Sequence, residues 1–469
     1  MFLTAALLLA GLFFGTRWAL IRPREAQTEL VLPAGERPEY TLHLRYGGTD
    51  DTLAVTEEIA WVNREDARLD SVCLRVNAAA YAEEAASPAA AADIFERAYP
   101  GGFDAAAFIL EGCWVNEELS EAEMDTEQAN LLWVRRAVDP GERVLIRLRY
   151  RIRLPECAAL FGRAGDTVRL LQALPTVAAR YGGAWDTAPT ARYAAPQAME
   201  PSDVRITVDL AGGLRLAEGA GSGTDQLSLL IVPDTLAEAE ARLEGMTVTA
   251  LADTRDRAEK LLAAARKIWP AYVRCYGRLP LEKLTLVSLP LTDTGYSAPG
   301  LTLLDSAVTD AELEYRLAYW LAGQWFGWAV SADEARETWL TCSTRQWAAL
   351  RYARETGGAD AEERLRRLWV DLPMRENLHA AVTPGTPADG FPDLATFRAV
   401  MDGRACAFLY ALDELTHGGL DALLGRLVQE NAFQRVGRDT LLRAVYDACG
   451  RDAAPLMADW LDTYIMETP

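Results

Sequence analysis

The sequence predicts an α+β fold in which an N-terminal antiparallel β saddle or sandwich is followed by a mostly helical domain. Between residues 38 and 246, apolar and polar residues alternate with the period of a strand. From residue 309 onward, apolar residues recur at the three- and four-residue spacing of an amphipathic helix. The chain has 469 residues, of which 50% are hydrophobic and 25% charged, a globular balance that suits two or three domains.

The predicted β domain spans residues 28–248. Its clearest strands are YTLHLRY, SVCLRV, RVLIRLRYRIRL, DVRITVDL and MTVTAL, and Gly and Pro turns separate them. An Ala-rich stretch at residues 77–103 interrupts this pattern, and we expect it to form a loop that contains a short helix.

The predicted helical domain spans residues 250–469. It opens with the amphipathic segment TRDRAEKLLAAARKIWPAYVRCYG and the strand-like LEKLTLVSLP. The later segments AELEYRLAYWLAGQWFGWAV, WLTCSTRQWAALRYARE, AEERLRRLWVDL, FRAVMDGRACAFLYALDEL, GGLDALLGRLVQENAF and DTLLRAVYDACG each carry an apolar stripe. Gly, Pro and Asp mark the joints between these helices.

Residues 1–24 begin with the apolar run MFLTAALLLAGLFFG, which is typical of a membrane anchor or a signal segment. No small-residue cleavage site follows, so we favour a single N-terminal membrane anchor. Arg17, Arg22 and Arg24 follow the apolar run, and positive charges tend to stay in the cytoplasm. The orientation, extracytoplasmic or cytoplasmic, is left open, as is a hydrophobic N-terminus that docks on the fold.

The charge of the chain excludes one class of partner. Its 68 acidic and 47 basic residues give a formal net charge of -21, whereas binding to a phosphate backbone requires a basic surface. Nucleic acid is therefore not an expected partner. The seven Cys are scattered without a CxxC pair, so neither a zinc ribbon nor a disulfide framework is indicated.

Residues 319–327 read YWLAGQWFG, and Trp339 and Leu340 open WLTCS a short distance later. These strings resemble the HExxHQWFG and WLNEG motifs of the aminopeptidase N-like zinc metallopeptidases, a gluzincin family. The residues QWFG and WL match that pattern, and the step from Gly323 to Cys342 matches the nineteen positions from the second His to the third ligand of the family.

The resemblance covers about residues 38–465. VDPGERVLIRLRYRIRLP resembles a turn and long strand of the family's saddle domain, and ALPTVAARYGGAW and AYPGGF resemble stretches of its bacterial membrane-associated members. GYSAPGLTLL takes the place of the exopeptidase signature GAMEN. The resemblance implies a β saddle followed by a degenerate thermolysin-like domain.

The residues that the family needs for catalysis are replaced. Tyr319 and Gly323 stand at the two His positions, Cys342 at the third ligand and Trp320 at the general base. The stretch GYSAPG at residues 295–300 has no carboxylate for a substrate amine, and Met401 stands where the family has a transition-state tyrosine. The resemblance therefore predicts no catalytic residue, no metal ligand and no bound zinc.

A metal site rebuilt from other residues and a relocated hydrolase are the two alternatives to this prediction. Asp333, Glu334 and Glu337 precede the WL motif, and acidic residues at a helix start are usually solvated caps. A relocated hydrolase would need Cys342, Ser297 or Ser343 as nucleophile, and none lies in a GxSxG elbow. His379 or His417 would then have to approach in space as the base.

The aromatic replacements leave two outcomes open for the former catalytic cleft. Tyr319, Trp320, Trp325, Phe326 and Trp328 either fill it as core or line a dry pocket for an apolar or peptide ligand. The ligand-binding candidates in the second case are Tyr319, Trp320, Cys342, Tyr296 and Ser297. The leading hypothesis is a non-catalytic, membrane-associated binding or assembly component whose partner is a peptide or a membrane protein. The alternative is an active hydrolase with a relocated Cys342 or Ser nucleophile.

Overall fold

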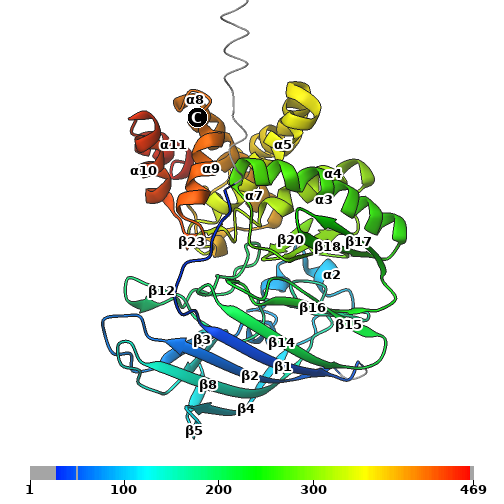
Figure 1. Ribbon diagram of the computed structural model, residues 1–469, viewed down its shortest axis with the longest axis vertical. Coiled ribbons are helices and arrows are strands. Elements are labelled where there is room, and N and C mark those ends of the chain that lie inside the picture. The colour runs from blue at the N-terminus through cyan, green and yellow to red at the C-terminus, as the bar shows by residue number, and fades with distance from the viewer. Residues whose placement is uncertain (1–27, 49–50, 465–469) are drawn as a thin grey trace, which may run out of the picture.

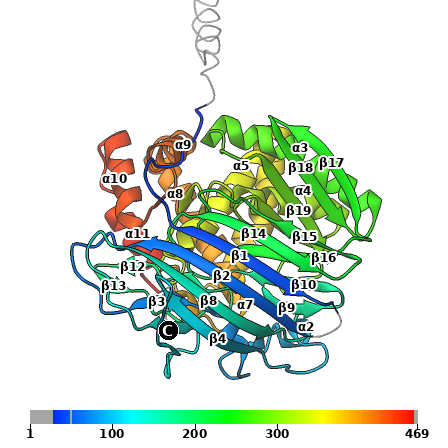
Figure 2. The same cartoon turned by 60° about the horizontal axis from the view of Figure 1, so that its bottom comes forward.

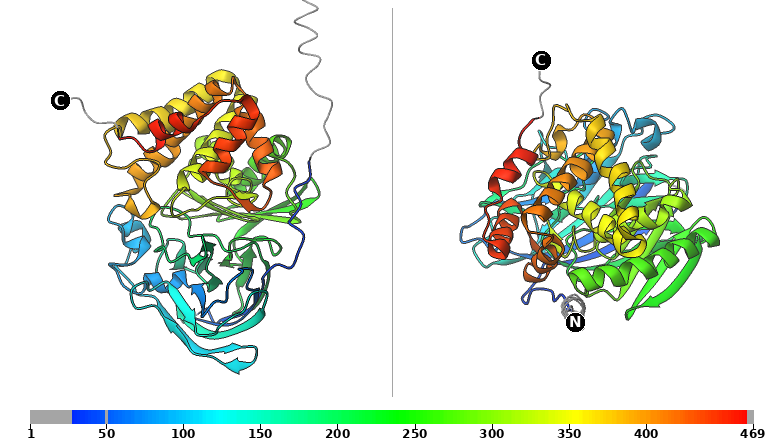
Figure 3. Two further views of the ribbon diagram at one scale, coloured as in Figure 1. Left: turned by 90° about the vertical axis from the view of Figure 1, so that its left-hand side faces the viewer. Right: turned by 90° about the horizontal axis from the view of Figure 1, so that it is seen from above.

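The computed structural model describes residues 28–48 and 51–464, and its architecture confirms the predicted α+β class. Figure 1 shows a sheet-rich N-terminal part below and a mostly helical C-terminal part above. Figure 3 shows the same division from the side and the helices from above.

The largest sheet has six strands in the order β14-β1-β2-β8-β4-β5, and Figure 2 shows most of them side by side. In β2 and β8, every second residue is buried, as the alternating sequence predicts. A slip of one residue would turn these apolar side chains to solvent, so burial fixes the register from Thr52 opposite Arg153 to Val62 opposite Arg143. All neighbouring pairs are antiparallel except β1 and β14, which run parallel. The strands are β1 (Glu39–Tyr46), β2 (Thr52–Val62), β4 (Ala107–Val115), β5 (Glu118–Leu119), β8 (Arg143–Arg153) and β14 (Asp203–Leu210).

Smaller sheets complete the N-terminal part, with strand orders β15-β16-β10-β9 and β11-β3-β7-β6 and a hairpin of β12 and β13. The Ala-rich insertion forms three short helical segments, η1 (Asn77–Tyr81), η2 (Pro88–Ala90) and α2 (Phe95–Ala98), which agrees with the predicted loop and short helix. The strands are β3 (Val72–Arg75), β6 (Ala122–Met124), β7 (Leu131–Val134), β9 (Phe161–Ala164), β10 (Thr167–Leu171), β11 (Thr176–Val177), β12 (Arg180–Tyr181), β13 (Ala184–Trp185), β15 (Leu214–Glu218) and β16 (Ser228–Pro233).

A five-stranded sheet in the order β17-β18-β19-β21-β20 underlies the helices. Its strands come from both sides of residue 250, where the sequence places the boundary between the two domains. The predicted limits 28–248 and 250–469 therefore stay a prediction. Helix α3 (Arg255–Tyr276) packs on this sheet, and Thr254 caps its first turn by accepting a hydrogen bond from the Arg257 amide at 3.2 Å. The strands are β17 (Ala237–Leu243), β18 (Met246–Ala252), β19 (Lys283–Leu289), β20 (Gly295–Ala298) and β21 (Leu301–Asp305).

The remaining helices pack together above the sheet around one large apolar core. They are α4 (Asp310–Ala322), α5 (Thr338–Arg366), the π-helical η3 (Arg367–Asp371), α6 (Leu372–Glu376), η4 (Ala388–Gly390), α7 (Leu394–Arg398), the π-helical η5 (Ala399–Arg404), α8 (Ala405–Leu415), α9 (Leu420–Glu430), α10 (Arg438–Cys449) and α11 (Ala454–Leu461). Two short strands, β22 (Val330–Ser331) and β23 (Gln434–Arg435), pair beside them.

The segment YWLAGQWFG is helical only in its first half. The sequence predicts a helix to Val330, but α4 ends at Ala322 and the following residues form turns. Gly327 has a φ of 153°, which disfavours other residues, and the indole nitrogen of Trp325 donates to the carbonyl of Gly277 at 2.9 Å. This prediction was wrong in extent because tertiary hydrogen bonds, which helical periodicity does not report, hold the turn.

Gln324 joins this turn to the β20–β21 hairpin. Its fully buried amide donates to the carbonyl of Ala298 at 2.8 Å and accepts from the amide of Gly300 at 2.9 Å. A buried side chain that satisfies backbone groups on a neighbouring strand fixes the distance between the two elements. The end of α4 and the GYSAPG stretch are therefore held together, as the site requires.

Residues 1–24, predicted as a membrane anchor, lie outside the described residues. Within residues 28–48 and 51–464, none of the helices has both the length and the apolar character that crossing a membrane requires.

Candidate functional site

The aromatic residues of segment 319–328 are buried. Trp325 contacts the rings of Trp269 and Tyr272 at centroid distances of 4.8 and 5.5 Å, and Phe326 contacts Tyr276 at 4.9 Å. Burial of such rings contributes strongly to core stability. Trp325 and Phe326 are therefore core residues, whereas whether the predicted cleft as a whole is filled or open stays a prediction.

Tyr319, at the first ligand position, is held in a buried polar network. Its hydroxyl donates to Asp402 Oδ1 at 2.6 Å and accepts from Arg398 Nη1 at 3.1 Å. Burial raises the pKa of the Tyr319 phenol well above its usual value, so the side chain stays protonated. A neutral, doubly hydrogen-bonded phenol is a poor ligand for Zn²⁺.

Gly323, at the second ligand position, lies against Ser297 and Arg345. A Cβ atom built on Gly323 would lie 2.6 Å from Ser297 Oγ, 2.7 Å from Ser297 Cβ and 3.0 Å from Arg345 Nε. Even a methyl group therefore meets other atoms here, and an imidazole does not fit unless both neighbours move.

Cys342 and Met401 complete the replaced positions. Cys342 is buried, and burial raises the pKa of its thiol far above its usual value, which disfavours the thiolate that binds metal or attacks a substrate. Met401 is completely buried in η5 and has no exposed surface at all. Neither residue offers an activated group.

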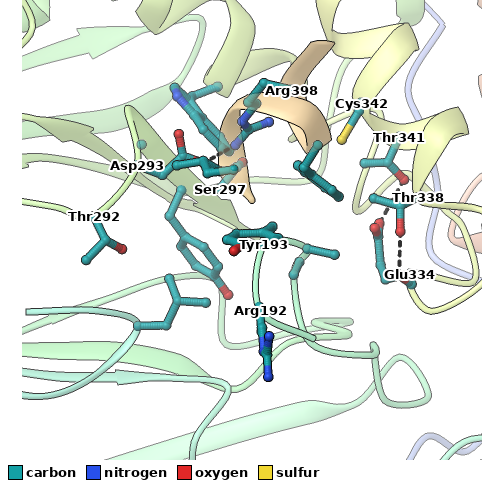
Figure 4. Close-up of a pocket in the computed structure, with 18 of the residues that line it drawn as sticks. Arg192, Tyr193, Thr292, Asp293, Ser297, Glu334, Thr338, Thr341, Cys342 and Arg398 are labelled. Atoms are coloured by element: carbon teal, nitrogen blue, oxygen red, sulfur yellow. Dashed lines mark hydrogen bonds and ion pairs between the residues drawn. The ribbon is translucent and has the colours of Figure 1, made fainter. Parts of the chain in front are cut away.

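A pocket lies beside these positions, between β20, α4, the start of α5 and the loop that carries Tyr193. Its cavity volume is about 80 Å³. Of the residues predicted from the sequence, it brings together Tyr296, Ser297, Trp320 and Cys342, but not Tyr319, Gly323 or Met401. Figure 4 shows Arg398 and Asp293 on one side and Cys342, Thr341, Thr338 and Glu334 on the other.

Arg398 separates this pocket from a second cavity of about 550 Å³ that Tyr319 and Asp402 line. The guanidinium forms ion pairs with Asp293 and with Asp402, the latter at 3.0 Å. Since Asp293, Leu394 and Arg398 border both spaces, the ion pairs form part of the wall between them.

Arg345, from α5, lies directly beside Gly323. It is 6% exposed and lines the pocket, and its Nε donates to the carbonyl of Phe326 at 2.8 Å. A Cβ on Gly327 would lie 2.3 Å from its Nη2. The two glycines, Gly323 and Gly327, thus leave the space that the guanidinium occupies.

Glu334 lines the same pocket and corrects one expectation. It was predicted to be a solvated cap, but it is 7% exposed, and its carboxylate accepts from the hydroxyl of Thr341 at 2.7 Å. Burial raises its pKa to about 7, against which Arg345 and the Thr341 hydrogen bond act. Asp333 is also not solvated, because its side chain is only 13% exposed, and it accepts from the amides of Ala335 and Arg336 in the turn before α5.

The residues at the zinc positions do not fit zinc. They offer a protonated phenol, a glycine and a buried thiol, and the guanidinium of Arg345 lies beside Gly323. A dication is disfavoured beside fixed guanidinium groups. Among residues 28–48 and 51–464, no group of three or more His, Cys, Asp and Glu side chains is placed to hold a metal ion.

The pocket offers no histidine as a base for the alternative nucleophiles. Ser297 Oγ accepts from Gln324 Nε2 at 3.2 Å, and Ser343 Oγ donates to a helix carbonyl. None of the pocket's lining residues is a histidine, and His379 borders a different cavity. The relocated hydrolase therefore gains no support from this geometry.

The fold is that of the M1 zinc metallopeptidases. An M1 zinc metallopeptidase from Deinococcus radiodurans matches with a TM-score of 0.61 and 16% identity, over 92% of this chain and 94% of that chain. A point mutant of a two-domain M1 zinc metallopeptidase bound to L-tryptophan matches with a TM-score of 0.62 and 16% identity, over 95% and 99% of the two chains. No protein-family model and no curated protein matches the sequence.

Sequence reasoning missed the charged residues of the site. Arg345, Arg398 and Asp293 lie in otherwise ordinary amphipathic or loop segments, so no motif marks them. The one available signal was the pair of glycines at 323 and 327, because a glycine at the place of a large ligand implies that another side chain fills the space.

Proposed function

We propose that this chain is a non-catalytic protein on the M1 metallopeptidase fold that binds a ligand or partner at the pocket beside the former zinc positions. The observation that carries the proposal is that other side chains occupy the space that zinc ligands would need. Ser297 and Arg345 fill the position of the second ligand, and Asp402 and Arg398 hold Tyr319 at the first. A side chain that occupies a metal position is a stronger reason against zinc than a missing ligand alone.

The test is zinc content together with hydrolysis. The purified protein is incubated with Zn²⁺ in a competing chelator buffer, its metal is measured by elemental analysis, and a panel of aminoacyl and peptide substrates is assayed. We expect less than stoichiometric zinc and no hydrolysis that chelators abolish. Stoichiometric zinc with chelator-sensitive turnover would overturn the proposal.

The variant Cys342→Ala serves as the matched control. If zinc or a covalent reaction depended on Cys342, the variant would lose the metal or the activity, whereas the proposal expects no change in either. An activity that survives chelators and disappears in Cys342→Ala would favour the relocated hydrolase instead.

We further propose that residues 1–24 attach the protein to a membrane and that its partner is a peptide or a membrane protein. The support is the apolar N-terminal run and the acidic body, which does not suit nucleic acid. Removal of residues 1–24 should move the protein from the membrane to the soluble fraction, and protease accessibility of the body in sealed vesicles reports the orientation. Equal membrane recovery of both forms would count against the anchor.

A further inference from the structure

The pocket contains a buried cation that lacks an ion-pair partner. Arg345 is 6% exposed, and its only hydrogen bond to a described residue is the one from Nε to the carbonyl of Phe326. No carboxylate among the described residues lies within ion-pairing distance, 4.0 Å, of its guanidinium. Arginine stays charged in proteins, and a buried unpaired charge is costly, so this group favours a counter-anion.

The acidic side chains nearest to Arg345 do not supply that counter-anion in full. Glu334 accepts a hydrogen bond from Thr341, and because burial raises its pKa to about 7, it is only partly ionised at neutral pH. Burial raises the pKa of Asp225 well above its usual value, which favours its neutral form. The pocket thus keeps excess positive charge.

Other groups around the pocket add to its preference for anions. Arg398 is neutralised by Asp293 and Asp402, but Arg192, also among the lining residues, is exposed and has no ion pair to a described residue. The hydroxyls of Ser297, Thr338 and Thr341 border the cavity as further polar groups. A carboxylate that enters therefore meets a planar guanidinium, which binds carboxylates with two parallel hydrogen bonds.

The size and apolar walls limit the rest of the ligand. A cavity volume of about 80 Å³ holds roughly six water molecules at about 10–15 Å³ each. Trp320, Phe397 and Leu160 contribute apolar surface beside the polar groups. The space suits a short apolar chain better than an extended peptide.

We propose that the pocket binds a small free organic carboxylate with a short apolar group, whose carboxylate pairs with Arg345. The fold's metal-binding position has on this view become an anion-binding position, because a fixed guanidinium now stands beside the place where the cation would bind. The inference rests on the proposed non-catalytic function, but its test is separate, since loss of carboxylate binding leaves the zinc and hydrolysis results unchanged.

The test compares three probes of nearly equal size: butyrate, butyramide and butylammonium. Binding to the full chain is measured by ligand-observed NMR and by the shift in melting temperature. We expect butyrate alone to bind, with a Kd of order millimolar, as about six non-hydrogen atoms allow. No butyrate binding at about 20 mM, or equal binding of butyramide, would overturn the proposal.

Variants assign the interaction to Arg345. Arg345→Met should abolish butyrate binding. Arg345→Lys should weaken it about tenfold, because lysine cannot form the two parallel hydrogen bonds of a planar guanidinium. Glu334→Gln should tighten binding several-fold, since it removes the competing carboxylate. Arg169→Met, at another buried arginine that does not line the pocket, should bind like the unaltered protein.

The design holds even where Arg345→Met fails to fold. In that case unchanged butyrate binding in both Arg345→Lys and Glu334→Gln would refute the proposal. Weaker binding in Arg345→Lys together with tighter binding in Glu334→Gln would support it. Tighter binding of the dipeptide Gly-Phe than of butyrate would refute the preference for a small free carboxylate.

Discussion

Replacement of Gly323 by alanine tests directly whether the second ligand position is filled. The residue caps α4 with φ -62° and ψ -17°, a helical conformation that alanine adopts without strain. In free space, Gly→Ala at such a position stabilises a protein by about 0.4–1 kcal/mol, because it restricts the unfolded chain. The outcome therefore depends on the surroundings of the new methyl group.

The distances at Gly323 predict the opposite sign. The added Cβ would lie 2.6 Å from Ser297 Oγ, 2.7 Å from Ser297 Cβ and 3.0 Å from Arg345 Nε, closer than atoms approach without displacement. Overpacking of this kind costs about 1–3 kcal/mol. We expect Gly323→Ala to lower the free energy of unfolding by about this amount, measured by urea denaturation.

The control for this prediction is the double variant with Ser297→Gly. It removes both of the closest atoms, so the penalty of Gly323→Ala should shrink by about 1 kcal/mol or more in the resulting double-mutant cycle. If Gly323→Ala is neutral or stabilising in the unaltered chain, the position is open and the reasoning against zinc at this site fails.

Three further predictions concern buried polar groups. Glu57 is completely buried, donation by the Tyr150 hydroxyl at 2.8 Å only partly offsets burial, and its pKa is raised from 4.5 to about 8. The folded state therefore keeps a proton that the unfolded state releases above pH 4.5. The free energy of unfolding should fall by about 5 kcal/mol through this group as the pH rises from 4.5 to 8. Glu57→Gln should remove that part of the fall in urea titrations at several pH values, and equal pH dependence of both proteins would contradict the prediction. Arg398→Met should lower stability by about 3–5 kcal/mol because it leaves two carboxylates unpaired, and a loss below about 1 kcal/mol would show that the ion pairs are worth little. Tyr319→Phe should cost about 1–3 kcal/mol at Asp402, read from the same denaturation curves, and a more stable variant would contradict that network.

The frame of the molecule could be predicted from the sequence because it follows periodicity and matched motif positions. The alternation in RVLIRLRYRIRL places alternate residues in the core of β8, and the helical spacing of AELEYRLAYWLA gives α4. The QWFG string also led to the correct fold, since Gln324 and Trp325 make contacts that hold α4 to β20 and α3. Such signals are local or motif-based, so a single sequence contains them.

The chemistry of the site could not be predicted in the same way. Arg345 lies in α5 between apolar residues and Arg398 in α7, and the sequence gives no reason to place either beside Gly323 or Tyr319. Glu334 was expected to be a solvated cap because its position before a helix is usually exposed, but packing against Gln197 and Thr341 buries it. Contacts between residues far apart in the chain depend on the tertiary fold, which local patterns do not describe.

Gly323 and Arg345 are connected through the space that they share and the charge that Arg345 carries. With His at position 323, the imidazole would need the space of Ser297 and Arg345, so restoration of the ligand alone would displace a buried guanidinium. With Arg345 in place, its positive charge repels a dication and attracts an anion. A glycine at 323 and an arginine at 345 thus suit one another, and we expect zinc binding here to require replacement of both. This coupling is the physical reason why we propose a carboxylate, and not a metal ion, as the ligand of this pocket.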